Sequence, residues 1–363
     1  MNLEPSRNPE YIESRTYGSL LRDTLNAIDL IKTLGSGGIP DDLQRGLLSQ
    51  FGGFGPIAEV FRHRDDLTGQ NLAARDELER LLTPMEFSLA RESVETAYYT
   101  PPSYIPLVWS AASRLVGVSH PLVLDPGCGI GNFAMNKPPA VCVKEIYGVE
   151  IEPISAAIAK KLAWGRVYNK DFFEWGCPLR FDLAIGNIPF TDGVRAKYKG
   201  FDKKVELHAR FILRVLDLMQ LGGVIALATT TGTLDSTGPN GEYLAFRQHV
   251  NFKARFLGAV RLPQGGFNAY KTQACVDIIF LQASRGQPGD PRPGLAWITT
   301  APTEVISHKT NKPCPINKYF VEHPEQMLGE LALDRLTGDK AVVLPRPEQD
   351  TLTLLGEALD RII

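Results

Sequence analysis

Short apolar runs alternate with helix-forming segments through the middle of this 363-residue chain. Residues 206–220 repeat their apolar positions at helical spacing, and residues 154–163 follow a proline at a favoured first helical position. The apolar runs between such segments have strand length. Strands that alternate with helices are typical of a parallel sheet. The pattern predicts an α/β, doubly wound Rossmann-like sheet with strands at 121–125, 146–150, 181–186, 224–228, 256–260 and 276–281.

The two ends of the chain lack this alternation. Residues 1–90 predict short helices, because 20–34 has helical apolar spacing and two glycine clusters interrupt the pattern. Beyond the Gly- and Pro-rich segment 285–294 the sequence is mixed, with a helix expected at 351–362. We therefore expect a helical N-terminal region at 1–90, a central domain at 91–285 and a small mixed C-terminal appendage at 286–363.

A glycine-rich turn follows the first predicted strand. Asp125 ends that strand, and Gly127, Gly129 and Gly131 follow with G-x-G-x-G spacing. Glycines allow tight turning and close approach of the backbone to a ligand. The nicotinamide fingerprint needs a glycine at position 132, where this chain has Asn. The turn indicates a nucleotide-like cofactor, and a general Rossmann turn fits the same spacing.

Two further acidic residues follow later strands. Glu150 ends the second strand, 19 residues after Gly131, and a carboxylate in that place typically accepts hydrogen bonds from ribose hydroxyls. Asp171 follows another short strand-like run, where it is placed to accept from an adenine amine with Phe172 against the ring. Each acid alone is compatible with a solvated strand end. Three acids that each close an apolar run favour a cofactor site.

The tetrapeptide Asn187-Ile188-Pro189-Phe190 follows the strand at 181–186. An aromatic amine is a poor nucleophile because its lone pair is delocalised, and two acceptors on its hydrogens free that lone pair. The side-chain oxygen of Asn187 and the carbonyl of Ile188 are candidates for these acceptors. Pro189 stiffens the turn, and Phe190 offers a face for a stacked base. A simple turn at a strand end is the alternative.

These motifs, in this order, resemble those of amino-methyltransferases that act on DNA adenine. The stretches that carry the resemblance are Tyr98-Tyr-Thr-Pro-Pro102, Asp125-Pro-Gly-Cys-Gly-Ile-Gly-Asn-Phe133, Glu150, Asp171-Phe172 and Asn187–Phe190. More narrowly, the chain is similar, over roughly residues 25–330, to the methylase part of large methylase–helicase proteins of phages and mobile elements. The resemblance implies a Rossmann-like methyltransferase that uses S-adenosylmethionine to methylate the N6 amine of a flipped adenine.

The resemblance also assigns residues to the two sites. It implies a catalytic role for Asn187, Ile188, Pro189 and Phe190. It implies cofactor binding by Tyr99, Thr100, Pro101, Asp125, Gly127, Cys128, Gly129, Glu150, Ile151, Asp171 and Phe172.

Two features depart from the family pattern. Position 188 is Ile where the family usually has Pro; since a backbone carbonyl is needed there, we expect activity to survive. The chain also ends at Ile363, without room for a helicase. We expect DNA as a partner; the chain then acts either on its own or together with a separate helicase or target-recognition subunit.

Composition narrows the remaining choices. The chain has no long apolar run of membrane-spanning length and no signal-peptide core, so we expect a cytoplasmic protein that does not bind a membrane. Its five scattered cysteines form no C-x-x-C pair, so neither a disulfide framework nor a metal site is expected. The net charge of −2 restricts DNA contacts to a local surface.

A basic segment directly after the tetrapeptide is the local candidate. We expect a phosphate-contacting loop there, interleaved with aromatic residues, and an ordinary solvated loop is the alternative. Its cations are Arg195, Lys197, Lys199, Lys203 and Lys204. His208 follows and is more typical of a structural histidine than of a site residue.

Two other functions fit parts of the pattern. A protein-glutamine methyltransferase also grips a planar amide nitrogen, although the basic segment and the helical N-terminal region favour DNA. A catalytically inactive DNA- or cofactor-binding subunit is compatible with Ile188.

Overall fold

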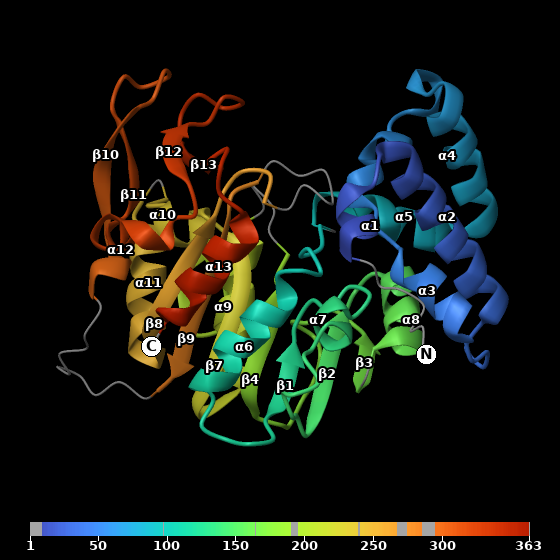
Figure 1. Ribbon diagram of the computed structural model, residues 1–363, viewed down its shortest axis with the longest axis horizontal. Coiled ribbons are helices and arrows are strands. Elements are labelled where there is room, and N and C mark those ends of the chain that lie inside the picture. The colour runs from blue at the N-terminus through green and yellow to red at the C-terminus, as the bar shows by residue number, and fades with distance from the viewer. Residues whose placement is uncertain are drawn as a thin grey trace.

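A seven-stranded sheet forms the centre of the molecule (Figure 1). The computed structural model describes residues 9–96, 98–163, 165–189, 195–238, 240–266, 274–284 and 295–362. The strands are parallel except β9, which runs antiparallel between its two neighbours. Their order across the sheet is β3 (Arg166–Asn169), β2 (Glu145–Glu150), β1 (Leu122–Asp125), β4 (Phe181–Asn187), β7 (Met219–Thr230), β9 (Val276–Ala283) and β8 (Ala254–Leu262).

The order reverses at β1, because the chain moves outward to β2 and β3 and then returns to β4 on the other side. This confirms the predicted doubly wound sheet. A cleft between diverging loops forms at such a reversal, outside the carboxyl ends of the strands. The predicted turn, acids and tetrapeptide all follow strands beside this reversal.

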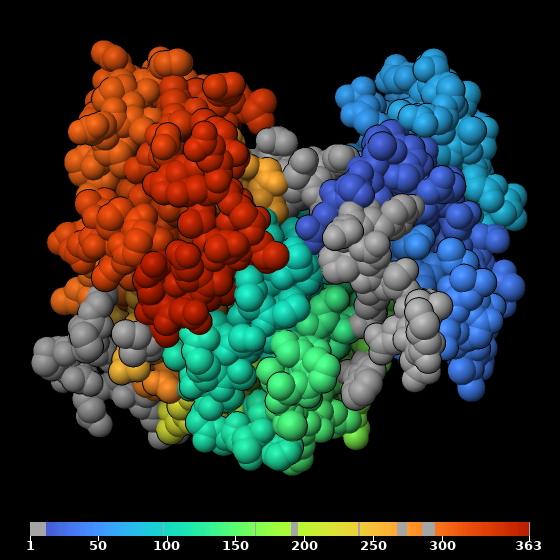
Figure 2. Space-filling view, viewed as in Figure 1, coloured from blue at the N-terminus to red at the C-terminus, as the bar shows by residue number. Residues whose placement is uncertain are grey.

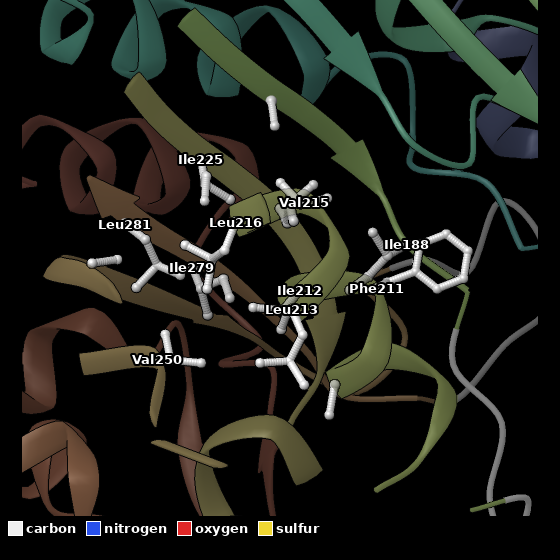
Figure 3. Close-up of a cluster of buried hydrophobic side chains, with 14 of the residues drawn as sticks. Ile188, Phe211, Ile212, Leu213, Val215, Leu216, Ile225, Val250, Ile279 and Leu281 are labelled. Carbon is white, nitrogen blue, oxygen red and sulfur yellow. The ribbon is translucent and has the colours of Figure 1, made fainter. Parts of the chain in front are cut away.

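Helices cover both faces of the sheet. On one face, α6 (Ile105–Leu115) packs over β4 and β7, and the terminal helix α13 (Thr351–Asp360) packs beside it over the edge strand β8. On the other, α9 (Leu207–Leu218) and α11 (Glu242–Lys253) bury a large apolar cluster, part of which Figure 3 shows. The expected helices at 206–220 and 351–362 are therefore present, with slightly different ends. The short helices α7 (Asn132–Met135) and α10 (Gly232–Asp235) follow β1 and β7.

The N-terminal region packs beside the β3 edge through α8 (Pro153–Leu162). Its helices are α1 (Pro9–Ser14), α2 (Tyr17–Leu34), α3 (Asp42–Ser49), α4 (Gly69–Leu81) and α5 (Pro84–Glu92), with 3-10 turns at Gly55–Phe61, Arg64–Asp66 and Ser93–Glu95. Local sequence fixes their starts: Asp41 and Thr83 each form a capping box, with Gln44 and Glu86 respectively. A helical N-terminal region is thus observed, while the exact domain limits stay a prediction.

The C-terminal part stands beside the other edge of the sheet (Figure 1). It contains the antiparallel pairs β10 (Thr300–Ile306) with β11 (Pro313–Asn317) and β12 (Glu330–Leu333) with β13 (Ala341–Leu344). Helix α12 (Lys318–Glu322) and 3-10 turns at Leu295–Ile298 and Pro324–Gln326 connect them. Figure 2 shows a wide hollow between this part and the N-terminal helices. The hollow lies on the side of the sheet toward which the parallel strands point.

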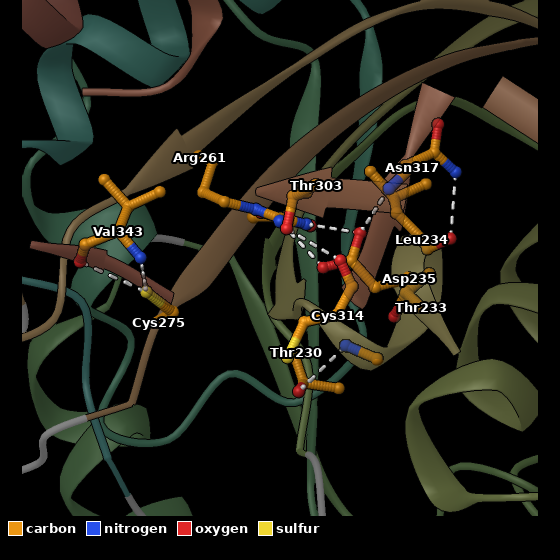
Figure 4. A network of polar contacts seen from close by, with 12 residues as sticks. Thr230, Thr233, Leu234, Asp235, Arg261, Cys275, Thr303, Cys314, Asn317 and Val343 are labelled. Carbon is orange, nitrogen blue, oxygen red and sulfur yellow. Dashed lines mark hydrogen bonds and ion pairs between the residues drawn. The ribbon is translucent and has the colours of Figure 1, made fainter. Parts of the chain in front are cut away.

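A buried polar cluster joins the C-terminal part to the sheet (Figure 4). Arg261 of β8 is fully buried and donates to Asp277 at 2.7 and 2.8 Å and to Asp235 at 2.7 and 3.0 Å. The backbone N–H of Asn317 donates to Asp235 at 2.8 Å. The guanidinium also lies 4.3 Å from the ring centre of Phe320. Four separate segments meet here with their charges paired.

Candidate active site

A cavity of about 270 Å³ opens at the carboxyl ends of β1, β2 and β4. It lies at the reversal of strand order, where the fold predicts a ligand site. Most of the predicted cofactor and catalytic residues line it; Pro101 and Ile188 do not. The predicted residues on its wall are Tyr99, Thr100, Asp125, Gly127, Cys128, Gly129, Glu150, Ile151, Asp171, Phe172, Asn187 and Pro189.

The glycine turn and the tetrapeptide are in contact. A Cβ atom on Gly127 would lie 3.2 Å from Cδ of Pro189, which is tighter than an ordinary side-chain contact. Gly129 has a φ of +53°, and a Cβ there would lie 2.6 Å from the ring of Tyr99. Gly129 therefore requires glycine for space and for its backbone conformation, and Gly127 lets the two segments approach closely. The structure brings the two predicted motifs onto one cavity wall.

Glu150 holds the glycine turn in place. Its Oε2 accepts from the backbone N–H of Gly129 at 2.8 Å, and its Oε1 accepts from that of Glu152 at 2.8 Å. Burial raises the pKa of Glu150, and these N–H groups oppose the shift. A carboxylate oxygen can accept more than one hydrogen bond. Glu150 can therefore brace the turn and still accept from a ligand.

Asp125 is a buried carboxylate with one satisfied oxygen. It is 3% exposed and accepts a backbone hydrogen bond from Gly127, while Oδ1 has no hydrogen-bond partner. A Cβ on Gly186 would lie 2.5 Å from that Oδ1, so the neighbouring strand needs glycine to leave room for it. Burial, together with the charge of Glu150, raises the pKa of Asp125 to about 8. An unpaired buried carboxyl group favours a cationic ligand.

Other polar atoms on the cavity wall, including Oγ1 of Thr100 and Nδ2 of Asn132, also have no hydrogen-bond partner among the described residues. Both residues are at least nine-tenths buried. Buried polar groups are almost always paired in folded proteins. Unpaired donors and acceptors gathered on one cavity wall therefore point to a polar ligand.

Asp171 and Phe172 form the far wall of the cavity. Oδ1 of Asp171 accepts from the backbone N–H of Phe173 at 2.8 Å, which fixes the carboxylate in the turn after β3. Phe172 is 2% exposed and stacks on Phe211 of α9, with ring centres 5.1 Å apart. The wall is thus a rigid aromatic surface with one carboxylate beside it.

Asn187 ends β4 with its amide in a fixed orientation. Nδ2 donates to the main-chain oxygen of Tyr98 at 2.7 Å. Because a carbonyl oxygen only accepts, this bond fixes which end of the amide carries the nitrogen. The other end, Oδ1, is out of contact with solvent and has no hydrogen-bond partner among the residues that the structure describes. Asn187 therefore presents an unused acceptor to a ligand that brings an N–H group.

The rest of the tetrapeptide divides between core and cavity. Ile188 is 1% exposed, and its side chain packs beside Phe211 in the core (Figure 3). Its backbone N–H donates to the carbonyl of Ala228 at 3.2 Å, extending the pairing of β4 with β7. Proline has no N–H and would lose this bond. Pro189 lines the cavity, and Phe190 lies outside the described residues.

The basic segment contains a hairpin, so the prediction of a loop there was wrong. β5 (Ala196–Tyr198) pairs with β6 (Phe201–Val205), with Tyr198 opposite Phe201. The ring of Tyr198 lies against Phe173, and that of Phe201 lies against Phe246 of α11. Tyr198 Oη donates to Asp217 at 2.8 Å. The four lysines of the candidate set, Lys197, Lys199, Lys203 and Lys204, are exposed on the hairpin.

Arg195 differs from those lysines. Its guanidinium lies 3.5 Å from Oε1 of Glu242, at the start of α11, and its side chain is 23% exposed. The predicted DNA contacts are not tested by this geometry. The four lysines are exposed, while Arg195 already has a carboxylate partner.

His208 stays out of the cavity wall. It is 1% exposed, and its Nε2 lies 2.9 Å from the hydroxyl of Tyr243, which also lies 2.9 Å from a carboxylate oxygen of Glu206. Since the carboxylate only accepts, Tyr243 donates to it and accepts from Nε2–H of His208. Burial lowers the pKa of His208 to about 3. His208 is thus a neutral, structural histidine.

Cavity residues missed by the sequence reasoning include Asn132 and Arg210. Asn132 belongs to the quoted glycine motif and was considered there only as a departure from the nicotinamide fingerprint. Arg210 lies on the cavity side of α9, one turn after Glu206. Its place on an amphipathic helix gave no separate signal. In the described part of the chain, no group of His, Cys, Asp and Glu is arranged to hold a metal ion, and no helix is long and apolar enough to cross a bilayer.

The strand order, with one antiparallel strand between the last two parallel strands, distinguishes one class of Rossmann-like fold from the others. The fold is the class I Rossmann-like methyltransferase fold. No family model matches the chain.

Comparison with known proteins gives partial matches. The chain is 26% identical over 304 residues to defense against restriction protein B of Escherichia phage P1, covering 82% of this chain and 12% of that protein. A 68-residue stretch is 37% identical to the type II methyltransferase M.CvrRI of Paramecium bursaria Chlorella virus XZ-6E, covering 19% of this chain and 18% of that protein. The chain thus spans less than a fifth of either relative, and similarity to part of a large phage protein is confirmed.

Among solved structures, the chain resembles the methyltransferase subunit of the type I restriction-modification system from Streptococcus thermophilus. The superposition has a TM-score of 0.45 and 17% identity, and it covers 72% of this chain and 66% of that one.

Proposed function

We propose that this chain transfers a methyl group from S-adenosylmethionine to the N6 amine of adenine in DNA. The observation that carries the proposal is the unused Oδ1 of Asn187, a residue of the cavity wall whose Nδ2 donates to the carbonyl of Tyr98. An exocyclic amine brings the N–H group that this acceptor needs. The partial similarity to a viral type II methyltransferase agrees with the same chemistry.

The residues of the cavity fit S-adenosylmethionine. The buried Oδ1 of Asp125 matches the ammonium group of the cofactor, and the free polar atoms of Thr100 and Asn132 match its carboxylate. Glu150 retains acceptor capacity for the ribose hydroxyls, and Asp171 for the adenine amine. The acidic character of the wall favours a cofactor with a net positive charge. When bound, the cofactor supplies an electrophilic methyl group on its sulfonium.

The chain's own contribution to catalysis is alignment and polarisation. Oδ1 of Asn187 accepts one hydrogen of the amine, and the carbonyl of Ile188 accepts the other. Accepting both hydrogens frees the nitrogen lone pair for attack. Because Asn187 and Ile188 are each tied down by a hydrogen bond to a neighbouring segment, the acceptors are positioned before substrate arrives. Such preorganisation supplies much of the rate in group-transfer reactions.

DNA as the substrate is supported by the shape and charge around the cavity. The base must leave the duplex to reach a cavity of this kind. The wide hollow of Figure 2 offers space for a nucleic acid between the N-terminal helices and the C-terminal strands. The exposed lysines of the β5–β6 hairpin follow directly on the tetrapeptide segment and supply local positive charge in a chain of net charge −2. A separate helicase or target-recognition subunit is part of this proposal.

The acceptor class is tested by transfer of labelled methyl groups. The purified chain is incubated with labelled S-adenosylmethionine and, separately, duplex DNA, single-stranded DNA and a glutamine-rich protein. We expect label in DNA and none in the protein. Label in the protein alone would replace the DNA proposal with glutamine methylation. Binding of cofactor and DNA without any transfer would instead identify an inactive subunit.

A further inference from the structure

Arg210 is a cation on the cavity wall that the proposed reaction does not yet use. It lies on the first turns of α9, between Leu207 and Phe211, and all three residues line the cavity. Its guanidinium carbon lies 4.3 Å from the ring centre of Phe173. Its Nε is shielded from solvent and has no hydrogen-bond partner in the described part of the chain. Stacking on the ring holds the side chain in one place, so its donors are preorganised.

Phe173 links Arg210 to Asp171. The ring of Phe173 carries the guanidinium, and its backbone N–H donates to Oδ1 of Asp171 at 2.8 Å. One residue therefore fixes both a hydrogen-bond donor and an acceptor on the same part of the wall. Phe172 lies between Asp171 and Phe173 in the sequence. Its flat ring stacks on Phe211 and also lines the cavity.

We infer that Arg210 and Asp171 together read the base of the cofactor. The inference rests on the proposed function. On adenine, the N6 amine is a donor, and the ring nitrogens on either side of it, N1 and N7, are acceptors. Asp171 accepts from N6, and Arg210 donates to one of the flanking nitrogens. This donor–acceptor pair selects adenine over a 6-oxo purine, which reverses the polarity of position 6.

Electrostatics favours this role over binding of a DNA phosphate. Glu150 and Asp171 line the same cavity, so a phosphate that entered it would meet their carboxyl groups. A neutral ring nitrogen meets no such repulsion. A donor that is already stacked and partly desolvated also loses little freedom on binding.

Calorimetry with S-adenosylhomocysteine and its 1-deaza and 7-deaza analogues tests the inference without turnover. The unaltered chain should bind the parent compound and bind one analogue roughly tenfold or more weakly, because a hydrogen bond from a charged donor is lost. Arg210→Met keeps the length of the side chain and removes its donors. It should weaken binding of the parent to a similar extent and bind that analogue as well as the parent.

Arg214→Met is the matched control. Arg214 lies one turn further along α9, donates to the carbonyl of Trp175 at 2.9 Å and is not part of the cavity wall. This variant should retain the discrimination of the unaltered chain. Equal discrimination by the Arg210 variant and the unaltered chain would overturn the role of Arg210 and leave the proposed function intact. A failure of the unaltered chain to bind S-adenosylhomocysteine would overturn both.

Discussion

Asn187 at the end of β4 and Asn317 at the end of β11 have opposite surroundings. Asn317, beside the Arg261 cluster, uses its whole amide: Nδ2 donates to Leu234 and Trp297 at 2.8 and 2.7 Å, and Oδ1 accepts from Tyr319 at 3.1 Å. Asn187 uses only Nδ2, and its buried Oδ1 is left without a partner. Since leaving a buried acceptor unpaired costs about 1–3 kcal/mol, the fold alone gives no reason to keep Asn187 in this state.

Two aspartates repeat the contrast. Both oxygens of Asp277 accept from Arg261, whereas Oδ1 of Asp125 accepts from nothing. The buried polar groups of the Arg261 cluster at β8 therefore pair with one another, and the cluster holds the C-terminal part in place. Near β1 and β4, polar atoms stay unpaired among the described residues, and we expect a ligand to pair with them. Substitutions in the Arg261 cluster should change folding, and substitutions on the cavity wall should change binding or catalysis.

The largest effect is expected at Arg261. Arg261→Met leaves Asp277 and Asp235 without their cation, and breaking a buried ion pair on one side typically costs about 3–5 kcal/mol. Chemical denaturation of the variant should show a loss of this size. Arg255→Met, on an exposed position of the same strand, is the control and should change stability little. Equal stability of the two variants would show that the Arg261 cluster does not hold the fold.

A smaller effect in energy, confined to catalysis, is expected at Asn187. Asn187→Ala removes one of two acceptors, and loss of one preorganised polar group in an active site typically lowers turnover by roughly 100- to 1000-fold. Single-turnover methyl transfer should fall accordingly, while S-adenosylhomocysteine affinity by calorimetry changes much less. Asn71→Ala, whose amide oxygen accepts from Tyr17 on the N-terminal helices, should retain turnover. Near-normal turnover in the Asn187 variant would contradict the role of its free oxygen.

A pH-dependent effect is expected at Asp125. Burial raises its pKa to about 8 in the folded chain, above the ordinary value of about 3.9 in the unfolded chain. The folded state therefore holds a proton that the unfolded state releases. Without cofactor, the stability contributed by this group should fall between roughly pH 4 and 8, by at most about 1.4 kcal/mol per pH unit.

The comparison partner for this titration is Asp125→Asn. Relative to this variant, the unaltered chain should lose stability as pH rises from 5 to 7, and the loss should level off above pH 8. A difference that stays constant with pH would show that Asp125 is ionised in the folded protein.

The smallest effect is expected on the hairpin. Replacing both Lys203 and Lys204 by Ala should weaken duplex binding for all sequences and flatten the slope of log K against log salt by about one unit per lysine. Lys144 is exposed directly before β2, at the amino ends of the strands and away from the cavity. Lys144→Ala should therefore leave the slope unchanged. A double variant with the original slope would place the DNA on another surface.

The contrast between the Arg261 cluster and the cavity wall also explains which features could be predicted from the sequence. The cofactor wall was predictable because Asp125, Glu150 and Asp171 each follow a strand, and parallel strands bring their carboxyl ends together. Each such motif is local, so its type and spacing are visible in one chain. The contact of Gly127 with Pro189 then follows from the strand order.

Features that depend on partners distant in sequence were not predictable. Arg195 pairs with Glu242, 47 residues away, and the Arg261 cluster draws on four segments. Whether a polar atom such as Oδ1 of Asn187 lacks a partner depends on all the segments packed around it. The β5–β6 hairpin was missed because its strands are short and lysines obscure the alternation of Tyr198 and Phe201.

Nucleoside analysis of methylated DNA tests the central claim most directly. DNA lacking N6-methyladenine is incubated with the purified chain and S-adenosylmethionine, then digested to nucleosides and separated with mass detection. The account predicts N6-methyl-2′-deoxyadenosine as the product, with its yield lost in Asn187→Ala. A methyl group on cytosine, or equal yields from both proteins, would contradict it.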